Sequence, residues 1–140
     1  MTNRMKEEAR LELIVHMAQE TKAEDLRLFD MENRSSITDF VFICSGRSQA
    51  HVRGIADKIV EEMKNAGHTC HFMEGHQEGS WILMDFDVVL VHVFHPETRA
   101  YYNLEELLAG FPGKRYDEQG NVEIIAAVTP QPQTGAVETA

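Results

Sequence analysis

Two short segments of the sequence contain residue types that could process a nucleotide. Asp85 and Asp87 flank Phe86, and carboxylates two residues apart on a strand point the same way, which suits Mg²⁺. The segment 45–48 (SGRS) precedes a helix, whose free N–H groups attract anions. It has neither a P-loop lysine nor the three glycines of a dinucleotide fingerprint, however, and acids at turns commonly form local hydrogen bonds. An ordinary turn and an ordinary strand-to-helix connection are therefore favoured over a magnesium site.

Histidine and cysteine gather in the segment 68–76 (HTCHFMEGH), which raises the question of zinc. On a strand, His68 and Cys70 would share one face while His71 points away, so the cluster would be split. Exposed histidines are the favoured interpretation. Cys44 lies in an apolar run, where a thiol is inert, and both cysteines are expected to be free thiols. We therefore expect no metal, no cofactor and no catalytic residue.

The densest group of aromatic and charged residues has the makeup of a protein interface centre. Its members are Trp81, Asp85, Phe86, Phe94, Arg99, Tyr101, Tyr102 and Glu105. Core packing is the alternative for Trp81 and Tyr101. His92 lies within a strand-like run, where a hydrogen-bonded core position and a contact role are equally compatible with its type.

Helical spacing of apolar residues predicts three helices that would position this group. The first spans 7–20, with Leu11, Ile14, Val15 and Ala18 on one face. The second begins after Ser48 as N-cap and stops at Gly67. The third begins at Pro96, and its apolar stripe is expected to comprise Tyr101, Leu104, Leu107 and Leu108.

Strands are predicted between these helices. Continuous apolar runs indicate buried strands at 39–44 and 88–94. Further strands are expected at 23–31, 68–73, 80–84 and, after the third helix, 122–128. Helices alternating with buried strands predict the α/β class: a mixed β-sheet with flanking helices, its last three central strands joined by hairpins.

Composition limits the function classes. A chain of 140 residues with 43% apolar content has room for one core, so we expect a single domain over 1–116 and an acidic, disordered tail over 117–140. The net charge of −10 argues against nucleic-acid binding and favours a basic protein partner. No run reaches the ~18 apolar residues of a spanning helix, and the charged N-terminus is unlike a signal peptide. A soluble, cytoplasmic protein is expected.

Five segments in one register resemble the ribosomal silencing factor (Iojap-like) family. They are 38–57 (TDFVFICSGRSQAHVRGIAD), 74–75 (EG), 79–85 (GSWILMD), 91–94 (VHVF) and 99–105 (RAYYNLE). The resemblance covers roughly 7–108. The sequence departs from the family pattern in two places: 85–88 (DFDV) replaces the common Asp-Tyr-Gly-Asp, and Leu107-Leu108 replaces Leu-Trp.

The resemblance implies a nucleotidyltransferase-like fold that has lost its catalytic residues. It also implies binding to the large ribosomal subunit, on universal ribosomal protein fourteen, which blocks joining of the small subunit and represses translation. Matched by motif, the implied partner-binding residues are Trp81, Asp85, His92, Phe94, Arg99, Tyr102 and Glu105. We expect Trp81, His92 and Arg99 to point outward, and the free protein to pair as a homodimer. A Mg²⁺-dependent nucleotidyltransferase is the alternative function.

Overall fold

The computed structural model describes residues 3–31 and 38–125, which form four helices and a seven-stranded sheet. The helices are α1 (Asn3–Glu20), α2 (Gln49–Asn65), α3 (Pro96–Tyr102) and α4 (Leu104–Leu107). The strands are β1 (Glu24–Asp30), β2 (Phe40–Ser45), β3 (Phe72–Glu74), β4 (Trp81–Asp85), β5 (Val89–Phe94), β6 (Gly113–Tyr116) and β7 (Val122–Ile125). Within these residues, none of the helices has the length and apolar character needed to cross a bilayer.

The sheet is mixed, with the strand order β3-β4-β5-β2-β1-β6-β7. Only β2 and β5 pair in parallel, and the other neighbours are antiparallel. Strands β3, β4 and β5 follow one another as antiparallel neighbours, as expected. The predicted mixed α/β fold is confirmed, while its nucleotidyltransferase-like character remains a prediction.

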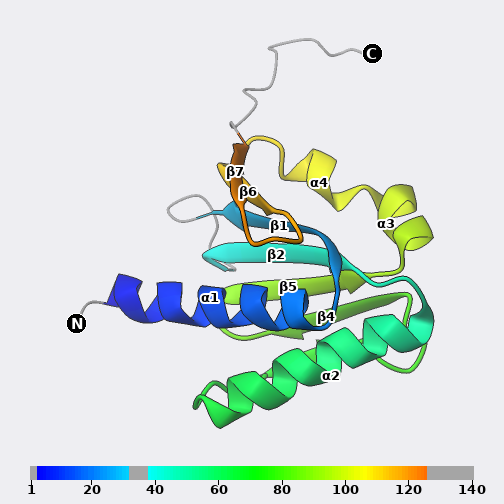
Figure 1. Cartoon of the computed structure of the whole chain (residues 1–140), viewed down its shortest axis with the longest axis horizontal. Helices are drawn as coiled ribbons and strands as arrows, with labels where there is room; N and C mark the ends of the chain where they lie inside the picture. The colour runs from blue at the N-terminus through cyan, green and yellow to red at the C-terminus, as the bar shows by residue number, and fades with distance from the viewer. Residues whose placement is uncertain (1–2, 32–37, 126–140) are drawn as a thin grey trace.

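The main core lies between one face of the sheet and the helices α1 and α2, which run across that face together (Figure 1). Ser48 caps α2 as predicted, because its Oγ accepts a hydrogen bond of 3.0 Å from the His51 N–H. The helical stripes expected for α1 and α2 are confirmed. Their buried members are Leu11, Ile14, Val15, Ala18, Val52, Ile55, Ala56, Ile59 and Met63.

The opposite face of the sheet has a smaller core. Its buried cluster comprises Phe29, Val41, Ile43, Phe94 and Leu108. In Figure 1, α3 lies beyond one end of the central strands and α4 lies above β1, and Leu104 of α4 packs against this smaller core. Among the residues that the structure describes, α3 reaches this face at Trp81 of β4, through Tyr102, while no helix lies over Phe72 of β3, which is 45% exposed.

The third helix differs from its prediction. It is interrupted at Asn103, whose φ of 47° lies in the left-handed region, so the chain continues as two short helices, α3 and α4. The break changes which side chains face the sheet. The expected apolar stripe is wrong for Tyr101 and Leu107, which are 82% and 75% exposed, whereas Leu108 is buried.

Strands β6 and β7 form a hairpin, so the sheet continues past the boundary expected at position 116. The Asp117 carboxylate fixes the turn by accepting hydrogen bonds from the N–H groups of Gln119 and Asn121, at 3.0 and 2.8 Å. The sheet therefore extends to Ile125, and we propose a domain boundary after this residue in place of the one at position 116. The disorder expected farther on, and the end of the strand expected at 122–128, fall on 126–140 and lie outside the described residues.

Candidate partner-binding face

Period-2 alternation along β4 divides its side chains between the two faces of the sheet. Ile82 and Met84 are fully buried under the helices, so Trp81, Leu83 and Asp85 point to the opposite face, where they are half-buried. Cross-strand pairing extends this face. We define the docking face as Phe72, Trp81, Leu83, Asp85 and Leu90, together with Tyr102 of α3.

Trp81 lies at the centre of an aromatic cluster at one end of the docking face. Its ring stacks on Phe94 with centroids 4.9 Å apart and contacts the Tyr102 ring at the same distance. The Trp81 indole N–H also donates a hydrogen bond of 3.0 Å to Nδ1 of His92. Phe94 is fully buried and Tyr102 is 55% exposed, so the cluster runs from the core to the surface. A half-buried ring that neighbouring rings hold in place is a suitable interface anchor.

His92 supports Trp81 as a neutral acceptor. It is 8% exposed, and burial lowers its pKa from 6.5 to about 4. At neutral pH its Nδ1 is therefore unprotonated and accepts the indole hydrogen bond. This bond fixes the tautomer, with the proton on Nε2.

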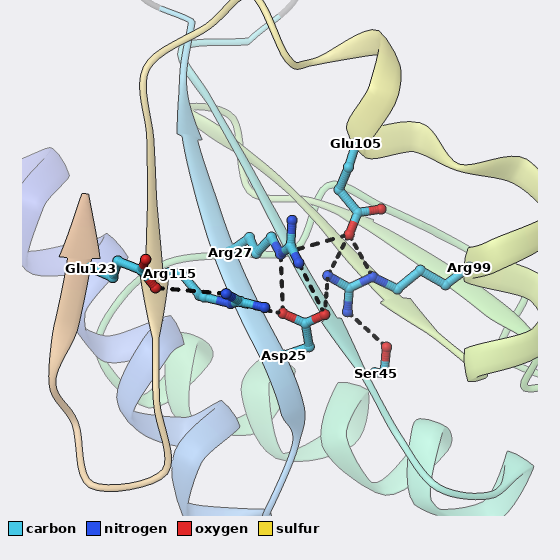
Figure 2. Close-up of polar contacts among 7 residues, drawn as sticks. All are labelled: Asp25, Arg27, Ser45, Arg99, Glu105, Arg115 and Glu123. Atoms are coloured by element: carbon cyan, nitrogen blue, oxygen red, sulfur yellow. Dashed lines mark hydrogen bonds and ion pairs between the residues drawn. The ribbon is translucent and has the colours of Figure 1, made fainter. Parts of the chain in front are cut away.

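Arg99 is buried, with 7% of its surface exposed, and its guanidinium joins α3 to α4 and to the sheet (Figure 2). Its Nε donates to a carboxylate oxygen of Glu105 at 2.8 Å, and Nη2 lies 2.6 Å from the same oxygen. Its Nη1 donates to the Ser45 hydroxyl at 2.7 Å. Charge-assisted contacts of this kind are among the stronger polar interactions in proteins.

The network continues through Asp25 toward the β6–β7 hairpin. Asp25 has a φ of 50° at an irregularity in the β1–β2 pairing, and its carboxylate lies among the guanidinium groups of Arg27, Arg99 and Arg115 (Figure 2). Burial raises the pKa of Asp25, but the Arg27 hydrogen bond and the three positive charges outweigh it, so the pKa lies below its ordinary value. Arg115 also pairs with Glu123 at 3.6 Å. Three cations thus meet three carboxylates, which leaves little unbalanced charge.

The sequence-predicted residues fall into separate groups in the structure. Trp81, His92, Phe94 and Tyr102 form the aromatic cluster, Arg99 and Glu105 form the ion pair, and Asp85 lies at the far end of β4. The expectation that His92 and Arg99 point outward is wrong, because each gains hydrogen-bond partners inside the fold. Phe94 is also fully buried, so these three side chains can affect a partner only through their neighbours.

Three apolar members of the docking face, Phe72, Leu83 and Leu90, were not identified from the sequence. Their register places them beside the predicted residues: Leu83 pairs with His92, and Phe72 and Leu90 both pair with Asp85. The sequence does indicate Leu83, because it lies two residues from both Trp81 and Asp85, and every second residue of a strand faces the same side. Phe72 and Leu90 depend on strand pairing, which the sequence alone did not define.

The acid pair and the 45–48 segment have local structural roles. Asp85 accepts a hydrogen bond of 2.8 Å from the Asp87 N–H, and Asp87 has a φ of 79°, which fits the turn favoured from the sequence. The Gly46 N–H donates to the Phe94 carbonyl at 2.9 Å, and the Arg47 N–H donates to Nδ1 of His51 at 2.9 Å. These N–H groups therefore already have acceptors and are not available to hold a phosphate.

The strand arrangement considered for the zinc alternative is absent, because β3 begins only at Phe72 and the residues 68–71 expected in that strand precede it. His76 instead pairs with Asp57 at 2.8 Å, and Cys70 donates to the Phe72 carbonyl at 3.2 Å. Within 3–31 and 38–125, no three His, Cys, Asp or Glu side chains are grouped as metal ligands. Burial raises the pKa of Cys44 to about 12, and both cysteines are free, as expected.

Comparison with known proteins identifies the family. The family described as "Ribosomal silencing factor during starvation" matches residues 4–138. The chain belongs to this family. A ribosomal silencing factor from Bacillus subtilis is 37% identical over 108 residues, which cover 77% of this chain and 92% of that protein. The resemblance inferred from the five segments is thereby confirmed.

Further relatives of this ribosomal silencing factor family member include a eukaryotic protein and two solved bacterial structures. A mouse protein named "Mitochondrial assembly of ribosomal large subunit protein 1" is 26% identical, over 69% of this chain and 44% of that protein. A crystal structure from Chromobacterium violaceum has a TM-score of 0.71 at 29% identity and covers 74% of this chain and 86% of that one. A second, from Bacillus halodurans, has a TM-score of 0.64 at 38% identity, over 69% and 90% of the two chains. The bacterial relatives are named as silencing factors of the ribosome, not as enzymes.

Proposed function

We propose that this protein represses translation by binding the large ribosomal subunit through its docking face and blocking association with the small subunit. The bound component is a basic ribosomal protein, and universal ribosomal protein fourteen is the candidate that the family resemblance supplies. The protein acts in the cytoplasm as a binding module and catalyses no reaction.

One observation carries this proposal: the half-buried apolar and aromatic surface over β3, β4 and β5, which α3 reaches at Trp81 and which the described helices otherwise leave open. Apolar patches rimmed by polar groups mark protein interfaces in soluble proteins. Trp81 provides an anchor that neighbouring rings hold in place. The net charge of −10 favours a basic partner by steering and by complementarity.

Co-sedimentation with isolated large subunits tests the proposal. Leu83→Glu places a charge within the docking face, and we expect it to weaken binding by roughly 30-fold or more, since hot-spot losses are about 2 kcal/mol. Ile124→Glu is the matched control, because Ile124 is a 70% exposed apolar residue on β7, at the other end of the sheet. The control should sediment with subunits like the wild type. Equal binding by Leu83→Glu and the wild type would contradict the proposal.

The absence of catalysis has its own test. The local hydrogen bonds of Asp85 and Gly46 support it, since they use groups that a Mg²⁺–nucleotide site would need. Isothermal titration with Mg²⁺ and a nucleoside triphosphate should give no saturable heat. Saturable binding that Asp85→Asn abolishes would support the nucleotidyltransferase alternative instead.

A further inference from the structure

Helix α3 is attached to the rest of the protein in an unusual way. Helices in globular proteins are normally held by an apolar stripe. The only side chain that α3 buries is that of Arg99, and α4 buries none within its bounds. A polar group therefore provides the internal attachment of α3.

The contacts of Arg99 reach three other elements. They are Glu105 of α4, 2.6 Å from Nη2, Ser45 of β2, 2.7 Å from Nη1, and Asp25 of β1, 3.7 Å from Nη2. The directed hydrogen bonds of the planar guanidinium are those of Nε to Glu105, at 2.8 Å, and of Nη1 to Ser45, whereas the Nη2 contacts are ion pairs. The backbone bond of 2.8 Å from the His95 N–H to the Ser80 carbonyl holds the start of α3, and Arg99 is the side chain that ties its last turn to the sheet and to α4.

Tyr102 lies one helical turn after Arg99, on the same helix. The backbone at Arg99 also closes that turn, because its carbonyl accepts a hydrogen bond of 2.8 Å from the Asn103 N–H. The Tyr102 ring contacts Trp81 at 4.9 Å. A displacement of Arg99 would therefore move Tyr102 away from Trp81.

We propose that Arg99 is a positioning residue for the docking face: through Ser45, Glu105 and Asp25 it holds α3 so that Tyr102 packs on Trp81, without itself touching the partner. The effect on ribosome binding rests on the proposed function, whereas the effect on Trp81 does not. The main core under α1 and α2 contains none of these residues, so it stays intact when the guanidinium is removed.

Trp81 is the only tryptophan, so its fluorescence reports this geometry directly. Arg99→Met keeps the aliphatic stem and removes the guanidinium. We expect iodide quenching of Trp81 to rise about twofold, because one side of the indole loses its covering ring. Binding to isolated large subunits should weaken about tenfold or more, as for loss of an interface anchor.

Arg115→Met is the matched control. Arg115 belongs to the same network but lies on β6, pairs with Asp25 and Glu123, and is 47% exposed. This variant should leave both Trp81 quenching and subunit binding unchanged. Tyr102→Ala should raise quenching as Arg99→Met does, and the double variant should add nothing further. Additive effects in the double variant would overturn the proposal.

Circular dichroism shows whether Arg99→Met is folded. If it is not, Glu105→Gln replaces it, since that change removes one charge of the pair at constant size and should raise quenching in the same direction. Wild-type quenching in the folded variant that is used would overturn the proposal. The same holds if Trp81 becomes exposed but large-subunit binding is unaltered. If the wild type itself binds no subunits, the proposed function fails, and the quenching result still decides whether Arg99 positions Tyr102.

Discussion

The pair formed by Trp81 and His92 explains how a single ring is held at the docking face. The indole N–H needs an acceptor in a half-buried position, and the neutral imidazole supplies it at 3.0 Å. A protonated imidazole has no acceptor at Nδ1 and would carry a buried charge. The orientation of Trp81 is therefore linked to the protonation state of His92.

The free energy of unfolding should decrease as the pH is lowered, because of His92. Its pKa is about 4 when folded against an ordinary value of 6.5, so the unfolded chain takes up the proton first. The stabilisation is complete above about pH 6.5 and is lost as the pH falls to about 4, with a maximum loss of about 3 kcal/mol. Urea unfolding of the wild type at several pH values between 7 and 4 measures this loss.

His92→Gln is the control for this pH dependence, because the glutamine carbonyl can accept the Trp81 N–H and does not titrate in this range. The difference in unfolding free energy between wild type and variant should shrink by about 3 kcal/mol between pH 7 and pH 4. A constant difference across that range would mean that His92 is not held neutral by burial.

The β3–β4 connection depends on a glycine. Gly75 has a φ of 87°, and a Cβ at that position would lie 1.9 Å from the Trp81 carbonyl oxygen. Gly75→Ala should therefore destabilise the protein by about 2 kcal/mol or more, through clash and strain at the start of β4. Gly54→Ala is the matched control on the exposed side of α2, where no atom lies within 4 Å. That change should stabilise by about 0.5–1 kcal/mol, since alanine favours helix. Equal unfolding midpoints for the two variants in urea would contradict this account of the turn.

Elements with strong hydrophobic periodicity were predictable from the sequence. The α2 stripe repeats at helical spacing, and the apolar runs of β2 and β5 are short, rich in β-branched and aromatic residues and bounded by turn residues, which favours strands. Strand β6 was missed because its sequence GKRY has no apolar alternation, and its pairing with β1 is a tertiary effect. The break at Asn103 was missed because a left-handed residue there depends on how the following segment packs.

The sequence indicated several residues of the candidate site, but it did not indicate which of their side chains are buried. The type and spacing of Trp81 and Tyr102 indicated a shared role, and the structure brings their rings together. Arg99 was expected at the surface because it belongs to an aromatic and charged group with the makeup of an interface and to the family motif. Its burial depends on a hydrogen bond to Ser45, 54 positions away in the sequence, and on an ion pair with Asp25. Asp25 lies at the irregularity in the β1–β2 pairing. Neither can be inferred from local pattern.

The free molecule should pair with a second copy. An uncovered apolar face on an isolated protein favours self-association, and the docking face provides one in each copy. Light scattering over a dilution series should show a dimer that dissociates on dilution, and Leu83→Glu should be monomeric throughout. Addition of large subunits should compete with dimer formation, because we propose the same face for both contacts. A wild type that is monomeric at every concentration would contradict this prediction.

The central claim concerns subunit joining, and the most direct measurement is a reassociation assay on sucrose gradients. Large subunits are incubated first with the protein and then with small subunits. We predict that the wild type and Ile124→Glu reduce the joined-ribosome peak in proportion to the large subunits they occupy. We predict that Leu83→Glu leaves the peak intact at the same concentration. Full joining in the presence of large subunits saturated with wild-type protein would contradict the account.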